Sequence, residues 1–233
     1  MAASIVPWEF RRRSGAIITT RRMPQQPWKW RGLFRWVGIA VLCIALCLLA
    51  APVWLPAIGR WLVLTGSDAK DATVKAEVLG IPNSPWIGSG LGTDRLLFAA
   101  DWIRQGRAKS IVMTCGTMYG ISDCERAREA LSAEGYPTLP MHEVRIHPSP
   151  AAIEAAALLA EVSRTGAGAT IVLTDQLESR RLNRVYQREG RKHGIRITVV
   201  SVANPRFDPA QWWRSREGQK AVVFELCQWV GVP

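Results

Sequence analysis

The sequence predicts one transmembrane helix followed by an α/β domain, in which a parallel sheet of about five strands is flanked by helices. Residues 36–58 contain no charged side chain, and beyond residue 73 short apolar runs alternate with longer amphipathic ones. We therefore divide the chain into a basic cytoplasmic tail (1–35), a transmembrane helix (36–58) and an exported domain (67–233), which has the size of one ordinary domain.

The apolar run is long enough to cross a bilayer. At about 1.5 Å per residue, a helix from Trp36 to Ile58 reaches roughly 35 Å, against a hydrocarbon core of roughly 30 Å. Before it lie eight basic residues and the single acid Glu9, whereas little beyond Arg60 follows it until Asp68. The positive-inside rule therefore predicts a single-pass protein of the bacterial inner (cytoplasmic) membrane, with a cytoplasmic N-terminus and an exported C-terminal domain. Cleavage of a signal peptide near Ala50 is the alternative.

The basic character of the chain comes mainly from its tail. The formal net charge is +11, and residues 1–35 carry +7 of it. Only +4 is left for the rest, so membrane topology and attraction to anionic inner-leaflet lipid explain the basicity. We expect the lipid bilayer as a partner and no nucleic acid.

Cysteines and histidines give no metal pattern. Cys43 and Cys47 lie in the apolar run, where we interpret them as apolar side chains, with lipidation as the alternative. A Cys115–Cys124 disulfide is compatible with an exported domain, but the sequence alone does not decide it, nor does it decide whether Cys115 is a nucleophile. The histidines are scattered and no CxxC motif occurs, so no metal site is expected.

Short β-branched and apolar runs predict five strands, and amphipathic runs between them predict the helices. The expected order is strand 74–79, helix 94–105, strand 110–114, helix 123–134, strand 143–146, helix 150–164, strand 169–174, helix 177–191, strand 195–202 and a last helix near 209–230. Gly106, Gly135 and Gly190 stand where a left-handed residue ends a helix. Ser149 before Pro150 is an expected N-cap.

The topology predicts where a ligand binds. In an open parallel sheet, ligands bind outside the carboxyl ends of the strands, where helix N-termini present unpaired N–H groups. Four places meet that rule: residues 80–92, 114–116, 147–149 and 174–176. The glycines at 88, 90 and 92 suggest a loop that covers the cleft, or a weak nucleotide or adenosylmethionine fingerprint that Pro82 and Pro85 interrupt.

A set of residues spread over the domain resembles the bacterial SanA/YdcF/ElyC family. The matching features are a strand ending in Val78-Leu79-Gly80, a helix with Arg95 near its start, a strand ending in Thr114-Cys115-Gly116, Glu125 opening the next helix, Ser149 with Glu154, Thr174 with Arg181, and Lys220 and Glu225 in the last helix. The resemblance implies a Rossmann-like domain associated with the bacterial envelope. It also implies that Glu125 and Glu154 are the catalytic acid or base, and that the ligand is bound by Arg95, Gly80, Thr114, Gly116, Ser149, Thr174 and Arg181.

The chain also departs from the family pattern. Ala152 and Ala155 replace a threonine and an asparagine around Glu154, Asp175 replaces a serine, Glu178 replaces a histidine, and Cys115 replaces a glycine. Glu178 differs from histidine in charge and reach, so proton transfer would differ as well. The chain is therefore either a divergent enzyme or a binding protein that has lost its chemistry.

Each candidate residue also has a structural explanation. Glu125 completes a capping box with Ser122, and Glu154 complements a helix N-terminus. Arg181 lies in a basic helix face, whereas Arg95 in a first helical turn calls for a bound anion or an acidic neighbour.

Together the arginines and glutamates indicate a polar cleft for an anionic small-molecule or lipid-linked ligand. We expect an envelope-biogenesis factor that acts on or binds a phosphate-bearing cell-wall or surface-polysaccharide intermediate. The alternatives are a membrane-tethered binding module without turnover and an adenosylmethionine-binding protein, and the sequence itself identifies no cofactor.

Overall fold

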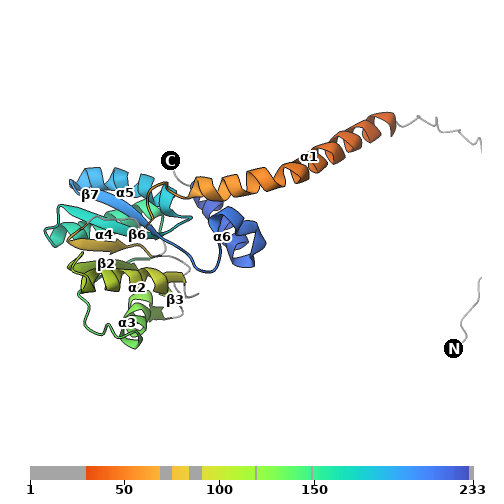
Figure 1. The fold of residues 1–233 in the computed structure, drawn as a ribbon. Helices are drawn as coiled ribbons and strands as arrows, with labels where there is room; N and C mark the ends of the chain where they lie inside the picture. Colours follow the sequence, from red (N-terminus) through yellow and green to blue (C-terminus); the bar gives the residue numbers. More distant parts are fainter. Residues whose placement is uncertain (1–29, 69–74, 84–90, 119, 148, 231–233) are drawn as a thin grey trace, which may run out of the picture. The chain divides into compact units, whose positions relative to one another are not determined.

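The structure is a computed structural model that describes residues 30–68, 75–83, 91–118, 120–147 and 149–230. Its C-terminal part is an α/β domain built on a five-stranded parallel sheet (Figure 1). Along the sheet the order is β5-β2-β1-β6-β7, and the strands are β1 (Val78–Ile81), β2 (Ser110–Cys115), β5 (Met141–Arg145), β6 (Ala169–Asp175) and β7 (Arg196–Val202). The predicted fold class is confirmed.

Helices cover both faces of the sheet. On one face α2 (Leu91–Arg104) and α3 (Asp123–Ala133) pack over a core that includes Leu79, Ile111 and Leu173. On the other face α4 (Ala151–Arg164) and α5 (Ser179–His193) pack over Val78 and Val172. Because side chains alternate along a strand, the nearly continuous apolar runs supply both cores at once.

The strand order reverses beside β1. The chain moves from β1 outward through β2 to β5, then returns through α4 to β6 on the other side of β1 and continues to β7. The loops that follow β1 and β6 therefore diverge to opposite faces at their carboxyl ends. That divergence opens the crevice in which doubly wound sheets bind their ligands.

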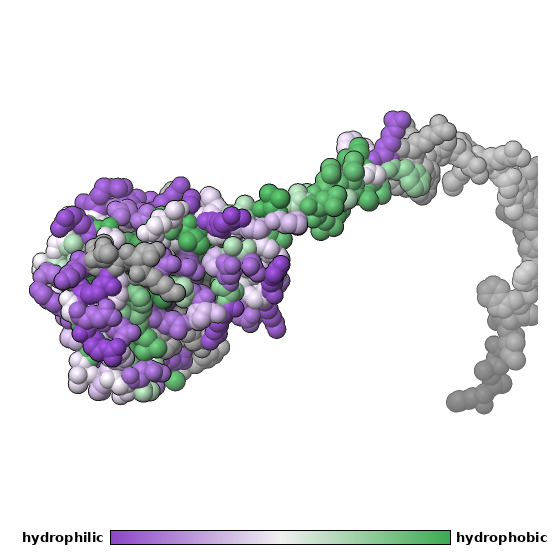
Figure 2. Space-filling view, in the orientation of Figure 1, coloured by the Kyte–Doolittle hydropathy of each residue, from purple (hydrophilic) through white to green (hydrophobic). Residues whose placement is uncertain are grey.

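The N-terminal helix α1 (Trp30–Leu62) is longer than the predicted span of 36–58. Its segment Phe34–Leu62 is long and apolar enough to cross a membrane, and Figure 2 shows the hydrophobic side chains along it. The helix passes through Pro52 and Pro56 and ends at Leu62.

The last two turns of α1 belong to the domain. Leu55, Ile58 and Leu62 pack in a third apolar cluster with Trp212 of η2 (Pro209–Arg214) and Val222 of α6 (Arg216–Val230). Trp212 donates from Nε1 to the Leu55 carbonyl over 2.8 Å. The contact requires a glycine at position 59, because a Cβ there would collide with the carbonyl oxygen of Pro209.

Several expected boundaries were wrong. Gly190 lies inside α5, which ends at Gly194 with a φ of 66°, whereas Gly106 and Gly135 have the left-handed φ that was expected. A Cβ on Gly190 would lie 2.5 Å from Cγ1 of Ile197, so a glycine there allows α5 to approach β7 closely. The last helical region is broken between η2 and α6. A two-stranded hairpin, β3 (Thr117–Met118) with β4 (Ile121–Ser122), was not predicted.

The expected N-cap at Ser149 was also wrong. Pro150 is the N-cap residue of α4, and it provides no side-chain hydrogen bond to the helix. The Ser149 hydroxyl is left buried and unpartnered among the described residues. Residue 74, the predicted start of the first strand, lies outside the described residues. The same holds for the glycines 88 and 90 of the loop that was predicted to cover the cleft.

Candidate functional site

Buried and half-buried polar side chains gather at the carboxyl ends of β1, β2 and β6, around the reversal point of the sheet. They come from five segments: Asn83 after β1, Arg95 in α2, Thr114 in β2, Glu154 in α4, and Thr174 with Asp175 at the end of β6. We refer to this group as the strand-end site. It lies where the topology rule placed a ligand, and it unites four of the predicted residues, Arg95, Thr114, Glu154 and Thr174.

Glu154 is the most tightly held carboxylate of the strand-end site. Its Oε1 accepts a hydrogen bond from the Thr114 hydroxyl and another from the backbone N–H of Asn83, each over 2.5 Å. Burial raises the pKa of Glu154, although both hydrogen bonds and the nearby Arg95 oppose the rise. A raised pKa makes the protonated form of the carboxyl group more accessible, which suits a group that gives and takes a proton as a general acid or base.

Arg95 is a buried cation with free hydrogen-bonding capacity. Its side chain is 2% exposed, and its Nε and Nη1 have no hydrogen-bond partner among the described residues. The charge of Arg95 acts on Glu154 and Asp175, where it partly offsets the rise in pKa that burial causes. The acidic neighbours predicted for this arginine are therefore present. They leave two of its nitrogen atoms, with three N–H donors between them, available for a ligand.

Other polar atoms around the site are also unpaired. The Thr174 hydroxyl is completely buried, and neither it nor Oδ1 of Asn83 has a partner among the described residues. The same holds for the hydroxyl of Tyr186, which lies in α5 and whose pKa is raised well above 10 by burial. Buried polar atoms without a partner are uncommon in folded proteins, and a missing ligand is one of the explanations.

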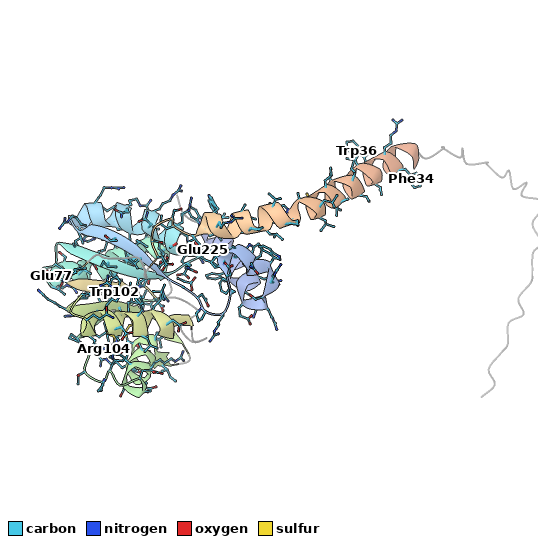
Figure 3. All side chains as sticks on the ribbon, in the orientation of Figure 1. Phe34, Trp36, Glu77, Trp102, Arg104 and Glu225 are labelled. Carbon is cyan, nitrogen blue, oxygen red and sulfur yellow. A yellow bond between two sulfur atoms is a disulfide. The ribbon has the colours of Figure 1, made fainter. Side chains whose placement is uncertain are left out.

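The guanidinium of Arg181, unlike that of Arg95, is not available for a ligand, because it binds Glu225 of α6. Nε donates to Oε1 over 2.7 Å and Nη2 donates to Oε2 over 2.9 Å (Figure 3 labels Glu225). Both side chains are buried. Burial raises the pKa of Glu225 to about 7, against the opposing effect of Arg181. The arginine that sequence analysis assigned to the ligand therefore binds a glutamate of the same chain.

Asp175 and Asn204 extend the site towards α6. The Asp175 carboxylate accepts from the Leu177 N–H over 3.1 Å and from the Asn204 amide over 3.3 Å. With Glu178, Phe207 and Glu225, these two residues line a small pocket whose free volume of about 10 Å³ has room for one water molecule. This pocket is too small to be the ligand site in the described conformation.

The remaining predicted residues have structural contacts. Glu125 is exposed at the start of α3 and completes the capping box, in which the Ser122 N–H donates to Oε2 over 3.4 Å. Gly80 lies within β1 and leaves room for Leu158 of α4, since a Cβ would lie 3.0 Å from that side chain. Gly116 permits Asn83 to approach, because a Cβ there would lie 2.8 Å from the Asn83 amide nitrogen.

Cys115 and Cys124 form a disulfide next to the strand-end site. Their Cα atoms are 5.5 Å apart, within the range that such a bond requires. It joins the end of β2 to the first turn of α3, on either side of the small hairpin. A disulfided Cys115 has no thiolate with which to act as a nucleophile.

Sequence analysis missed one residue of the site and left another without a role. Asn83 contributes its backbone N–H, so its side-chain type gave no signal. Asp175 fell within the predicted place 174–176 at the end of an apolar strand, but it was otherwise noted only as a departure from a family pattern. Among the described residues no group of three histidine, cysteine or carboxylate side chains could hold a metal ion.

The site offers cationic donors, hydroxyl donors and a proton-exchanging carboxyl group. This set can bind an oxyanion through Arg95 and Thr174 and can exchange a proton at Glu154. The acidic side chains nearby would repel an oxyanion unless some of them are protonated. The raised pKa values of Glu154 and Asp175 favour the protonated forms of these two carboxyl groups.

No protein-family pattern matches the chain, and no curated protein matches it either. Among solved structures it is similar to a universal stress protein in complex with cAMP, with 15% sequence identity and a TM-score of 0.34. The similarity covers 54% of this chain and 97% of that chain. The cAMP belongs to that protein, and nothing about this chain's ligand follows from it.

Proposed function

We propose that this chain is a membrane-anchored factor of bacterial envelope biogenesis, whose exported domain binds or acts on a phosphate-bearing cell-wall or surface-polysaccharide intermediate. The observation that carries the proposal is Arg95, a cation buried at the reversal point of the sheet with two nitrogen atoms, Nε and Nη1, unpaired among the described residues. A phosphate oxygen is the acceptor that such a guanidinium pairs with best.

The proposed roles differ from those that the sequence suggested. Arg95 takes the anion, because Glu225 already occupies Arg181 through two hydrogen bonds. Glu154 is the proposed acid or base, because its pKa is raised by burial, whereas Glu125 is exposed in its capping box. Thr174 supplies a hydroxyl beside the anion.

The location of the domain is proposed from two features. The basic residues that precede α1 favour a cytoplasmic N-terminus, so the domain lies on the far side of the inner membrane. The Cys115–Cys124 disulfide supports this placement, because disulfides persist in oxidising compartments and are rare in the cytosol. A ligand of the cell envelope is the kind that a domain tethered there would meet.

The test uses the full-length chain in detergent micelles, with inorganic pyrophosphate as the probe. Arg95→Gln should weaken pyrophosphate binding at least tenfold in calorimetry and abolish rescue of an envelope defect in a deletion strain. Arg104→Gln is the matched control, since Arg104 lies on the same helix, is exposed, and contacts Asp101 and the Tyr136 ring away from the strand-end site. Unchanged binding and rescue by a folded Arg95→Gln variant would refute the proposed site.

A second candidate is a binding module without turnover. The observation that favours it is the engagement of Glu154 Oε1 by both Thr114 and Asn83, which restrains the carboxylate that would have to move a proton. In that case Glu154 organises the loop after β1, and the ligand is held and released unchanged.

A further inference from the structure

We propose that Trp61, Arg180, Arg184 and Trp229 form a binding surface for the headgroups of anionic phospholipids. We call these four residues the arginine–tryptophan cluster. The inference rests on the membrane anchoring proposed above, but it concerns a surface separate from the strand-end site.

The cluster is built from three helices. Trp61 in the last turns of α1 and Trp229 in α6 have ring centroids 5.0 Å apart, at an interplanar angle of 41°. The guanidinium of Arg180 lies 5.8 Å from the centre of the Trp61 ring, and that of Arg184 lies 5.0 Å from the centre of the Trp229 ring. Two cations thus flank two rings that contact each other at a tilt. Such pairing holds each guanidinium in place.

Part of the cluster is open to solvent. Trp61 is 45% exposed and Arg184 is exposed. Arg180 reaches the Val63 carbonyl at the end of α1 through Nη2, over 3.4 Å. Its Nε and the Nε1 of Trp229 have no partner among the described residues. Both of these unpaired nitrogen atoms are buried, so the exposed guanidinium of Arg184 and the exposed face of Trp61 are what the cluster presents to a phosphate oxygen.

The position of Trp61 along α1 selects lipid as the occupant. Side chains of α1 are exposed and mostly apolar from Phe34 to Trp54, and burial against the domain begins near Leu55. A helix from Phe34 to Trp54 is roughly 31 Å long, which matches the hydrocarbon core of a bilayer. Trp61 then lies about 10 Å beyond Trp54, at the level of the headgroups.

The chemistry at that level fits the cluster. Tryptophan favours the boundary between hydrocarbon and headgroups, and arginine there pairs with phosphate. In the described part of the chain, no ion pair occupies Arg180 or Arg184. An anionic headgroup would therefore fix the orientation of the domain against the membrane, next to α6 and Glu225.

The experiment measures lipid retention by native mass spectrometry of the full-length chain, released from micelles that contain either phosphatidylglycerol or phosphatidylcholine. The wild type should retain phosphatidylglycerol at least tenfold more strongly than phosphatidylcholine. Arg180→Gln/Arg184→Gln should lose that preference. Arg191→Gln/Arg196→Gln removes the same charge from exposed positions at the far end of α5 and the start of β7, and it should keep the preference.

The outcome is independent of the strand-end site. Arg95→Gln should retain phosphatidylglycerol as the wild type does, even if it loses pyrophosphate binding. Equal retention of the two lipids by the wild type would overturn the inference. An unchanged preference in Arg180→Gln/Arg184→Gln, with α-helix content and melting temperature preserved, would overturn it as well.

Discussion

The guanidinium of Arg181 binds the carboxylate of Glu225 through two parallel hydrogen bonds, of 2.7 and 2.9 Å. Because Arg181 lies in the first turn of α5 and Glu225 lies in α6, this pair joins the segment after β6 to the helix that packs on the end of α1. Both side chains are buried, so removing either partner would leave an uncompensated charge, at a cost of roughly 3–5 kcal/mol. The ion pair therefore couples the strand-end site to the part of the domain that packs on the end of α1.

Glu225 gives the fold a dependence on pH. Its pKa is about 7 in the folded state, against an ordinary value of 4.5, because burial disfavours the ionised form. The folded state thus holds the proton more tightly than the unfolded state, so stability is greatest below about pH 4.5 and falls as the pH rises through 7. Thermal unfolding of the full chain in detergent between pH 4.5 and 8 should show this decline. Glu225→Gln should make the decline shallower, without removing the contributions of Glu154 and Asp175, and parallel curves for variant and wild type would contradict the assignment.

Glu154→Gln separates the enzyme from the binding module. Glutamine retains an oxygen that can accept from Thr114 and from the Asn83 N–H, so the melting temperature should change by only a few degrees. If Glu154 is the acid or base, turnover of a phosphate-bearing envelope intermediate should fall at least a hundredfold while binding persists. A variant that turns over substrate at the wild-type rate would exclude the catalytic role.

Gly190→Ala should destabilise the domain by about 1–3 kcal/mol, because the new Cβ would meet Ile197 and the carbonyl of Ile195 where α5 packs on β7. Gly168→Ala is the matched control, since no atom lies within 4 Å of the position of its Cβ. Urea unfolding of both variants measures the difference. Equal stability would mean that α5 and β7 are farther apart than described.

The disulfide is expected to stabilise the domain by about 2–4 kcal/mol, since it closes a short loop between β2 and α3. Without reductant, alkylation of the unfolded chain should leave Cys115 and Cys124 unmodified in mass spectrometry, and reductant should expose both. Cys115→Ala/Cys124→Ala should unfold at lower urea than the wild type. Alkylation of both residues in unreduced protein purified from membranes would contradict the disulfide.

The fold was largely predictable from the sequence. The uncharged run and the alternation of short apolar with amphipathic segments predicted the long helix and all five strands of the sheet. The predicted ends of helices were wrong where tertiary contacts override local sequence signals. Gly190 resembles a helix end in sequence, yet it lies inside α5 because Ile197 packs against it. The two residues of each hairpin strand, β3 and β4, are too few to give a periodic pattern.

The position of the candidate site could be predicted from the sequence, but the contacts between its side chains could be predicted only in part. The rule for parallel sheets located Thr114, Ser149 and Thr174 at strand ends before any side chain was placed. Spacing along the chain could not show that Arg181 meets Glu225, because those residues are 44 positions apart and the contact depends on how α6 packs. The contact of Asn83 with Glu154 could not be predicted for a different reason. It is made by a backbone N–H, which every residue except proline carries.

The proposed function depends most on where the domain lies, and fusion reporters measure this directly. Alkaline phosphatase joined after residue 230 should be active in cells, and green fluorescent protein joined at the same position should be dark, because the former works only outside the cytoplasm and the latter folds poorly after export through the general secretion pathway. The reverse pattern, with active fluorescence and inactive phosphatase, would place the domain in the cytosol. That result would contradict the envelope ligand and the disulfide together.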